Sequence, residues 1–345
     1  MDIKFSFRLL LLPFSWIYGS ITHLRNLLYS IGIFHSFEIP KKSICVGNLS
    51  IGGTGKTPHV DLLVDLLLSK NKKVAVLSRG YGRKAKGLIE VKKKSIAIEV
   101  GDEPLFYKKK HGDNLTVVVA EKRKIGVDYI LKNNPKNDII VLDDAFQHRA
   151  VKAGLNILIT EFNRPFYSDF VLPAGNLREF SSGKRRTDII IVSKSPDNIS
   201  KENEAEIRRK IGFNPEKIFF SKINYQPLKC FNLGIETETE SILLITGIAN
   251  PTPLMDKLKK NYSVTHLNYP DHHTFNSQDI AEIHQKFDTF ATGNKIIVTT
   301  EKDFMRLKDI DLVKSNQNNW FYQPIITTIK EETKFNQIIY EYCKV

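Results

Sequence analysis

The chain has 345 residues, enough for two domains with their own hydrophobic cores. Lysine and arginine outnumber the acidic residues, 51 against 38, and the formal net charge of +13 favours anionic partners such as nucleotides, phosphorylated metabolites or an anionic membrane. The three cysteines, Cys45, Cys230 and Cys343, lack the number and spacing of a disulfide framework or a zinc site, which fits a reducing compartment. No zinc-finger, homeodomain or RNP-type motif is present, which argues against a nucleic-acid partner.

Residues 1–35 predict an amphipathic helix that lies at a membrane interface. Apolar residues recur on one helical face at spacings of four and three: Ile17, Ile21, Leu24, Leu28 and Ile31. Lys4 and Arg8 precede this stretch, so cations would meet lipid headgroups while leucine and aromatic side chains insert among the acyl chains.

Other interpretations of this N-terminal segment remain open. A signal peptide would need a small-residue cleavage site, and none follows Tyr18. A transmembrane helix would need about 20 apolar residues, roughly twice the run found here, and Pro13 breaks that run. The third alternative is a helix that packs against the protein's own core.

A glycine-rich loop follows the first strand-like run. Ser43–Pro58 reads SICVGNLSIGGTGKTP, in which an apolar run ends in a loop whose backbone N–H groups would wrap a phosphate chain. Lys56 would reach the β- and γ-phosphates as a catalytic residue, and the Thr57 hydroxyl would bind Mg²⁺. The predicted nucleotide-binding residues are Ile51, Gly52, Gly53, Thr54, Gly55, Lys56, Thr57 and Pro58. Ser50 stands where the usual pattern has its first glycine, so an ordinary strand-to-helix turn is the alternative.

A second run supports nucleotide binding. Asp138–Asp144 reads DIIVLDD, four apolar residues that lead into two carboxylates, as in a Walker B strand beside a P-loop. Asp143 and Asp144 are therefore predicted ligands of Mg²⁺. The alternative is a core strand that ends in a solvated turn. The order and spacing of the two patterns favour a nucleoside triphosphate site.

Apolar runs alternate with helix-like segments through the rest of the chain. The strand-like runs are Ser43–Val46, Lys73–Leu77, Thr116–Val119, Ile139–Leu142, Leu155–Thr160 and Asp188–Ser193, and a second set comprises Ser241–Thr246, Val264–Leu267 and Lys295–Thr300. This rhythm predicts an α/β fold, a P-loop NTPase-like and mostly parallel sheet with helices on both faces. The predicted units are a P-loop kinase domain over 36–220 and, over 221–345, linker strands and a smaller α/β domain.

Polar clusters occur where such folds carry function, past the ends of apolar runs. The clusters are GNLSIGGTGKTP from Gly47, SRGYGR from Ser78, GDEP from Gly101, LDDAFQHR from Leu142, LPAGNLRE from Leu172, PDHH from Pro270 and VTTEKD from Val298. In this order they resemble one family, the tetraacyldisaccharide 4′-kinases of lipid A biosynthesis. The resemblance extends from the N-terminal helix to about Leu307, and Ser50 in the P-loop fits that family.

The resemblance implies a reaction and a place for it. The enzyme would use ATP and Mg²⁺ to phosphorylate the 4′-hydroxyl of a tetraacylated glucosamine disaccharide 1-phosphate, giving lipid IVA. It would sit on the cytoplasmic face of the bacterial inner membrane, held peripherally by its N-terminal helix, with no obligate protein partner. The active site would lie in the cleft between the two domains.

The resemblance also implies roles for single residues. Asp102 and His272 would form a catalytic pair that accepts the proton of the sugar hydroxyl, and domain closure would bring them together. Glu179 is a further expected metal ligand. Arg79, Gln147 and Arg149 are expected to contact the substrate.

A second function remains in view, a membrane-associated P-loop ATPase or GTPase without a small-molecule acceptor. Such a switch would carry a base-specificity motif such as N-K-x-D, and Thr299–Asp303 is only a loose echo of one. A third, nucleic-acid binding through the basic surface, predicts affinity that falls steeply with salt.

Overall fold

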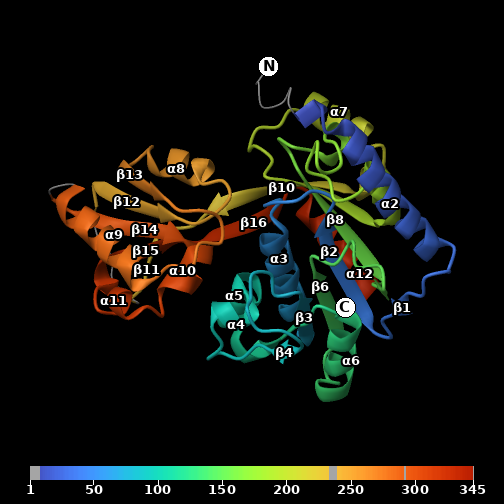
Figure 1. Cartoon of the computed structure of the whole chain (residues 1–345), viewed down its shortest axis with the longest axis horizontal. Coiled ribbons are helices and arrows are strands. Elements are labelled where there is room, and N and C mark those ends of the chain that lie inside the picture. Colours follow the sequence, from blue (N-terminus) through green and yellow to red (C-terminus); the bar gives the residue numbers. More distant parts are fainter. Residues whose placement is uncertain (1–7, 233–238, 291–292, 345) are drawn as a thin grey trace.

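The computed structural model describes residues 8–232, 239–290 and 293–344, so Lys4 lies outside the described residues. The chain forms a larger domain with a nine-stranded sheet and a smaller domain with a five-stranded sheet. Two neighbouring strands, β10 and β16, connect them (Figure 1).

The larger sheet is parallel except at its two edges. Its order is β16-β10-β9-β8-β2-β6-β3-β5-β4, and only β4 and β16 run antiparallel to their neighbours. The strands are β2 (Lys42–Asn48), β3 (Val74–Ser78), β4 (Ile89–Glu90), β5 (Leu115–Val119), β6 (Ile139–Asp143), β8 (Leu155–Glu161), β9 (Ile189–Ser193), β10 (Ile218–Tyr225) and β16 (Ile325–Ile329). A separate pair joins β1 (Phe37–Glu38) to β7 (Val151–Lys152). The mostly parallel sheet predicted from the apolar runs is confirmed.

Helices cover both faces of this sheet, as predicted. They are α3 (Lys56–Leu68), α4 (Ala97–Val100), α5 (Asp102–His111), α6 (Arg123–Asn133), α7 (Lys201–Ile211) and α12 (Glu332–Cys343). Alternate residues of β2 enter different cores, because successive strand side chains point to opposite faces. Val46 packs in the core shared with α3, α5 and α12, whereas Cys45 packs in the core shared with α6 and α7.

The smaller domain repeats the α/β pattern. Its sheet has the order β11-β15-β14-β12-β13, formed by β11 (Lys229–Cys230), β12 (Ser241–Thr246), β13 (Ser263–Asn268), β14 (Lys295–Thr300) and β15 (Trp320–Gln323). Its helices are α8 (Thr252–Leu258), α9 (Ser277–Phe290), α10 (Glu301–Leu307) and α11 (Asp311–Lys314). A helix follows each of β12, β13 and β14, as the sequence predicts.

The division at residue 221 differs from the prediction, because the chain returns to the larger domain before it ends. Residues 325–329 form β16, which pairs with β10 from Ser221 to Tyr225. The following helix, α12, fully buries Phe335 and Ile339 in the larger domain's core. The smaller domain is thus an insertion between β10 and β16, and residues 325–344 belong to the kinase domain rather than to the smaller one.

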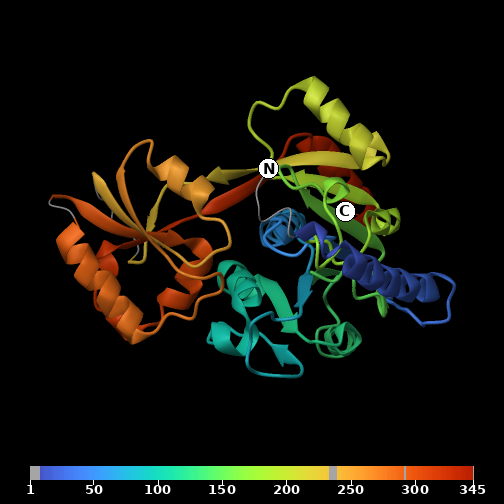
Figure 2. The same ribbon diagram turned by 45° about the horizontal axis from the view of Figure 1, so that its top comes forward.

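The N-terminal helix, α2 (Leu12–Ser30), lies against the larger domain through a narrow contact (Figure 2). Only Ser15 and Gly19 are buried along it. A Cβ on Gly19 would come within 2.3 Å of the ring of Phe180, so glycine is needed for this close approach. Most apolar side chains of α2 face away from the protein, among them Trp16 at 66% and Ile21 at 62% exposure. In the described part of the chain, no helix is long and apolar enough to cross a membrane.

Candidate active site

The P-loop lies between β2 and α3, where the sequence predicts it. Gly52 and Gly55 have φ angles of 94° and 88°, a region that side chains with a Cβ rarely adopt. Asn48 donates from Nδ2 to Thr54 Oγ1 at 2.7 Å, and Ser193 donates from Oγ to the Thr54 carbonyl at 2.7 Å. The loop conformation is therefore held from both sides, by the strand that enters it and by β9.

The two carboxylates of the predicted Walker B strand lie beside this loop. Asp143 ends β6, and the Oδ2 of Asp144 lies 3.6 Å from Lys56 Nζ. Arg178 donates to Asp144 through NH1 at 2.9 Å and NH2 at 3.3 Å. Burial acts to raise the pKa of Asp144, but the charges of Lys56 and Arg178 outweigh it, and the pKa lies below its ordinary value.

Asp143 is in the opposite situation. Burial, followed by the negative charges of Asp144 and Glu103, raises the pKa of Asp143 to about 7. Burial and, after it, the neighbouring negative charges therefore disfavour the ionised form of Asp143 at this strand end. A divalent cation would favour the ionised form of Asp143, and Thr57, the second residue of the adjacent helix α3, is the further ligand that the P-loop pattern predicts.

The number of carboxylates fits Mg²⁺ bound together with a nucleotide. Among the residues that the structure describes, no three His, Cys, Asp or Glu side chains are grouped as a metal site. Mg²⁺ is usually held by one or two carboxylates plus substrate phosphates and water, and two adjacent carboxylates such as Asp143 and Asp144 are compatible with that requirement.

Glu179, the other expected metal ligand, has different partners. Arg186 donates to both of its carboxylate oxygens, at 2.8 and 2.9 Å. Gln147 donates to Oε1 at 3.0 Å, and Asn26 of α2 donates to Oε2 at 2.6 Å. The side chain is 4% exposed. In this structure Glu179 links α2 to the loops beside the P-loop.

Asp102 and His272 come together across the domain boundary. His272 Nδ1 lies 3.0 Å from Asp102 Oδ2. Asp102 follows the short helix α4 and Gly101, rather than a strand, and it begins α5. His272 lies in the loop after β13 with a φ of 61°, and its N–H donates to the Gly247 carbonyl at 3.1 Å. The aromatic ring of Tyr81 makes an edge-on contact with the imidazole of His272, with the two ring centroids 5.3 Å apart.

Sequence reasoning missed two basic residues at this pair. Arg306 of α10 donates to both oxygens of Asp102, and Lys302 Nζ lies 3.2 Å from His272 Nε2. Lys302 lies in the VTTEKD cluster that contributes to the family resemblance, and Arg306 follows that cluster by three residues. Because Lys302 and Arg306 are four residues apart, they lie on one face of a helix. This spacing indicates that the two side chains face the same partner, but it does not identify that partner.

The expected substrate residues lie on the α2 side of the P-loop. Gln147 donates from Nε2 to the Asn48 carbonyl at 2.8 Å, and Arg149 donates to the Asn26 carbonyl and to Ser30 Oγ. Arg79 is exposed at the end of β3. These three side chains do not contact the Asp102–His272 pair in the described structure.

A concentration of positive charge surrounds His148 nearby. Burial, followed by the charges of Arg123, Arg25 and Arg79, lowers the pKa of His148 to about 4. Arginine side chains from α2, from the end of β3 and from α6 therefore converge on one region beside the Walker B strand. Such a region suits a phosphate or another anion.

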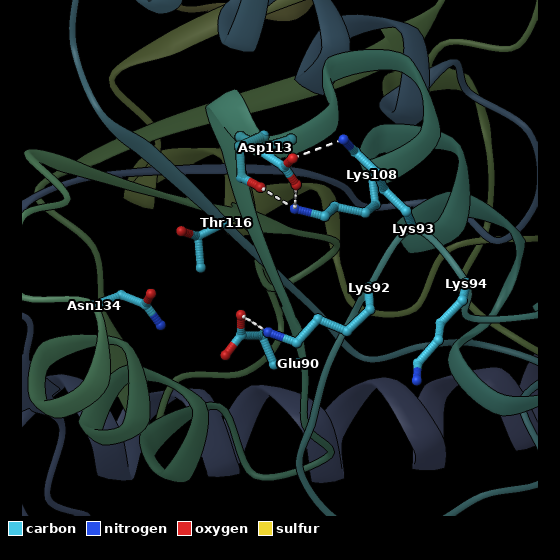
Figure 3. Close-up of a pocket in the computed structure, with 9 residues that line it drawn as sticks. Glu90, Lys92, Lys93, Lys94, Lys108, Asp113, Thr116 and Asn134 are labelled. Atoms are coloured by element: carbon cyan, nitrogen blue, oxygen red, sulfur yellow. Dashed lines mark hydrogen bonds and ion pairs between the residues drawn. The ribbon is translucent and has the colours of Figure 1, made fainter.

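A cavity of about 670 Å³ lies elsewhere, lined by Lys92, Lys93, Lys94, Lys108, Glu90 and Asp113 among others (Figure 3). Lys92 Nζ lies 2.5 Å from Glu90 and Lys93 Nζ lies 2.6 Å from Asp113. Leu115, which begins β5, also lines the cavity, so it lies at the end of the strands opposite the P-loop. It is separate from the candidate active site.

Three features define the class of protein. They are a P-loop between a strand and a helix, a pair of Walker B carboxylates, and a site at the domain boundary that residues of both domains form. Together they define a P-loop phosphotransferase. The family model described as tetraacyldisaccharide-1-P 4′-kinase matches residues 7–344, and the chain belongs to this family. It is accordingly an ATP-dependent kinase.

Individual relatives agree with that assignment. A tetraacyldisaccharide 4′-kinase of Flavobacterium psychrophilum is 44% identical over an alignment of 342 residues, and the alignment covers 96% of this chain and 96% of its own. One of Bacteroides thetaiotaomicron is 38% identical and covers 97% of this chain and 93% of its own. The crystal structure of LpxK from Aquifex aeolicus in complex with ATP has a TM-score of 0.75 at 30% identity, and covers 97% of this chain and 99% of its own.

Proposed function

We propose that this chain transfers the γ-phosphate of ATP to the 4′-hydroxyl of a tetraacylated glucosamine disaccharide 1-phosphate. The observation that carries the proposal is the contact between Asp102 and His272, which places a carboxylate and an imidazole from different domains at one boundary. Glu103, the next residue, influences Asp143, so this pair lies near the Walker B end of the sheet. The names of the family and of its relatives supply the acceptor.

The P-loop holds the nucleotide in this proposal. Backbone N–H groups of residues 52–57 surround the β- and γ-phosphates, and Lys56 neutralises charge on the transferring group. Asp143, Asp144 and the Thr57 hydroxyl would hold Mg²⁺, which when bound neutralises the phosphate oxygens. The ion pair between Lys56 and Asp144 orients the ammonium before nucleotide arrives.

The dyad activates the acceptor. Asp102 accepts a hydrogen bond from His272 Nδ1–H, which leaves Nε2 as the proton acceptor. The proton of the 4′-hydroxyl passes to Nε2 as the sugar oxygen forms its bond to the γ-phosphorus and the bond from that phosphorus to the β-γ bridging oxygen breaks. Asp102 then stabilises the imidazolium. Lys302 releases Nε2 by turning toward Glu103 or Asp271, which it already faces at 3.5 and 3.8 Å.

The arginine-rich region around His148 suits the anionic end of the acceptor. Arg79 is exposed there and would contact a substrate phosphate directly. Gln147 and Arg149 donate to protein carbonyls, so they would shape this region and anchor α2 beside it. An arginine of α2 itself, Arg25, contributes to the same field.

The exposed apolar face of α2 would bring the enzyme to its substrate. Phe14, Trp16, Ile17, Ile21 and Leu24 are each more than half exposed. A lipid interface would cover this surface while Arg25 remains near the headgroups. We propose peripheral attachment to the cytoplasmic face of the inner membrane, where an acylated disaccharide can enter the site without leaving the bilayer.

The test is a reaction of the purified chain with ATP, Mg²⁺ and the acylated disaccharide 1-phosphate in detergent micelles. Mass spectrometry should show a product heavier by one phosphate, and ³¹P–¹H correlation should place it at the 4′ position. ADP release should be nearly absent until the acceptor is added. Equal ADP release with and without acceptor would instead support the nucleotide switch.

A further inference from the structure

Arg306 occupies the centre of the contact between the two domains. It belongs to α10 of the smaller domain, yet its Nε donates to Asp102 Oδ1 of the larger domain at 2.9 Å, and its NH2 donates to Asp102 Oδ2. The side chain is only 6% exposed. The guanidinium thus meets both oxygens of one carboxylate, a fork-shaped contact that a lysine cannot reproduce.

The guanidinium is also held firmly from its own domain. NH1 donates to Asp303 Oδ1 at 2.8 Å and to the Gly247 carbonyl at 3.2 Å. Asp303 is itself fixed by the Gly247 N–H and by the Thr300 hydroxyl, at 2.9 and 2.7 Å. A chain of contacts therefore runs from the end of β12 through Asp303 and Arg306 to Asp102.

Other ion pairs cross the boundary without these features. Lys302 lies 3.5 Å from Glu103, and Lys109 lies 3.5 Å from Asp309. Each is a single contact with at least one partner 30% or more exposed, and such pairs contribute little to stability. Arg306 differs because its partner is the carboxylate that also holds His272.

We propose that Arg306 is a positioning residue: by donating to both oxygens of Asp102, it sets the carboxylate that orients His272, and it does so only when the smaller domain is seated. The proposal rests on the kinase function proposed above. It explains why a buried, rigidly supported arginine of the smaller domain is directed at a residue of the P-loop domain. Arg306 NH2 also lies 3.3 Å from His272 Nδ1, but Arg306 would not touch Nε2 or the other reacting atoms.

The charges that face Asp102 make the proposal measurable. Burial acts to raise the pKa of Asp102, and bonds from His272 and Arg306, with the charge of Lys302, bring it well below its ordinary value. Glu103 is the adjacent acidic group. Loss of the guanidinium removes both the hydrogen bonds and the charge of Arg306 that oppose burial, so the pKa of Asp102 should rise toward the pH range of an assay.

The experiment compares wild type, Arg306→Gln and Arg306→Lys in the micellar kinase assay from pH 5 to pH 9. Arg306→Gln should lower kcat by roughly 10²-fold at pH 8, the scale of a misplaced catalytic group. The deficit should grow at least a further tenfold as the pH falls to 5. Arg306→Lys keeps the charge and should recover the pH profile but not the full rate. The KM for ATP should stay within about twofold of wild type.

The matched control is Arg208→Gln. Arg208 is a half-buried arginine that joins α7 to Glu331 and to the Ile218 carbonyl, far in the chain from the dyad. Its loss should lower the melting temperature without altering the pH profile.

A deficit of Arg306→Gln that is the same at every pH, or a kcat within twofold of wild type, would overturn the proposal. If wild type does not phosphorylate the acceptor at all, the proposed function fails instead. Should Arg306→Gln not fold, Arg306→Lys decides: a lowered kcat with the wild-type pH profile supports the proposal, and a kcat within twofold of wild type overturns it.

Discussion

The imidazole of His59 joins the P-loop to the strand that leads into the smaller domain. Its Nε2 lies 2.8 Å from Ser221 Oγ on β10, and its Nδ1 lies 2.7 Å from the Gly55 carbonyl. Both ring nitrogens are thus engaged, and the side chain is buried. The conformation of the loop and the position of β10 are therefore fixed by the same neutral ring.

This contact predicts a pH dependence of stability. Burial lowers the pKa of His59 from 6.5 to about 4, despite the opposing bond to Gly55. Between these values the unfolded chain binds more protons than the folded one, so stability falls as the pH is lowered from 6.5 toward 4. The contribution is at most about 3 kcal/mol. Urea unfolding should show a shallower decline over this window for His59→Gln than for wild type. Exposed His35→Gln is the control, and equal slopes for wild type and His59→Gln would refute the prediction.

Lys56→Ala should abolish turnover while leaving the fold intact. The ammonium lies beside Asp144 at the loop that would hold the transferring phosphate. Removing such a charge from the reaction centre reduces kcat by 10²-fold or more. The kinase assay and a thermal melt would measure this. Lys132→Ala, on the exposed end of α6, should behave as wild type, and activity of Lys56→Ala within about threefold of wild type would exclude the loop as the phosphate site.

Asp143→Asn and Asp144→Asn should both weaken the dependence of the rate on Mg²⁺. Burial, followed by the nearby negative charges, disfavours ionised Asp143, so its neutral variant should melt at a higher temperature than wild type at pH 8 in the absence of Mg²⁺. Asp144 is paired with Lys56 and Arg178, so its variant should not gain stability. Titrations of rate against Mg²⁺ concentration supply the measurement. Unchanged half-saturation in both variants would contradict the Walker B assignment.

Loss of either member of the dyad should reduce kcat without loss of nucleotide binding. We expect Asp102→Ala and His272→Ala each to lower kcat by roughly 10²–10⁴-fold, the range of general-base catalysis. The double variant should be scarcely worse than the more impaired single one, because the two side chains act as a unit. Fully multiplicative losses in this cycle would mean that they act separately.

Charged residues on the outer face of α2 should release the protein from membranes. Trp16→Glu together with Ile21→Glu places carboxylates on side chains that are 66% and 62% exposed. Co-sedimentation with vesicles that contain anionic lipid should fall several-fold, while turnover of micellar substrate changes less. Ser20→Glu adds a charge at an exposed polar position of the same helix and is the control. Undiminished sedimentation of the double variant would show that another surface binds the membrane.

The local sequence pattern was sufficient to predict the elements that form the nucleotide-binding site. A buried parallel strand reads as an apolar run, so β2 and β6 were evident, and glycines with positive φ mark the loop between β2 and α3. The pairing of Asp102 with His272 came from resemblance rather than from spacing, since 170 residues separate them. Such a contact depends on tertiary structure, which periodicity does not report.

The missed features have a shared physical cause. In the sequence, Arg306 looks like any basic residue on a short helix. Only the fold brings Asp102 beside it as a hydrogen-bond partner. Similarly, residues 325–329 alternate in burial as a strand would, and Pro324 alone separates them from β15. The apolar runs identified in the sequence do not include this strand, and only the fold shows that it joins the larger sheet.

The insertion of the smaller domain imposes an order on biosynthesis. When β15 has been translated, every described strand of the smaller domain has been synthesised, whereas the kinase domain still lacks β16 and α12. Until those last residues appear, β10 has no neighbour on one side, and the surface that Phe335 and Ile339 will cover is bare. An unpaired strand beside an uncovered apolar surface invites association between nascent chains. The kinase domain can therefore complete its sheet and core only after residues 325–344 have been synthesised, and a frameshift within the codons for these residues should yield protein that chaperones recognise rather than a shortened enzyme.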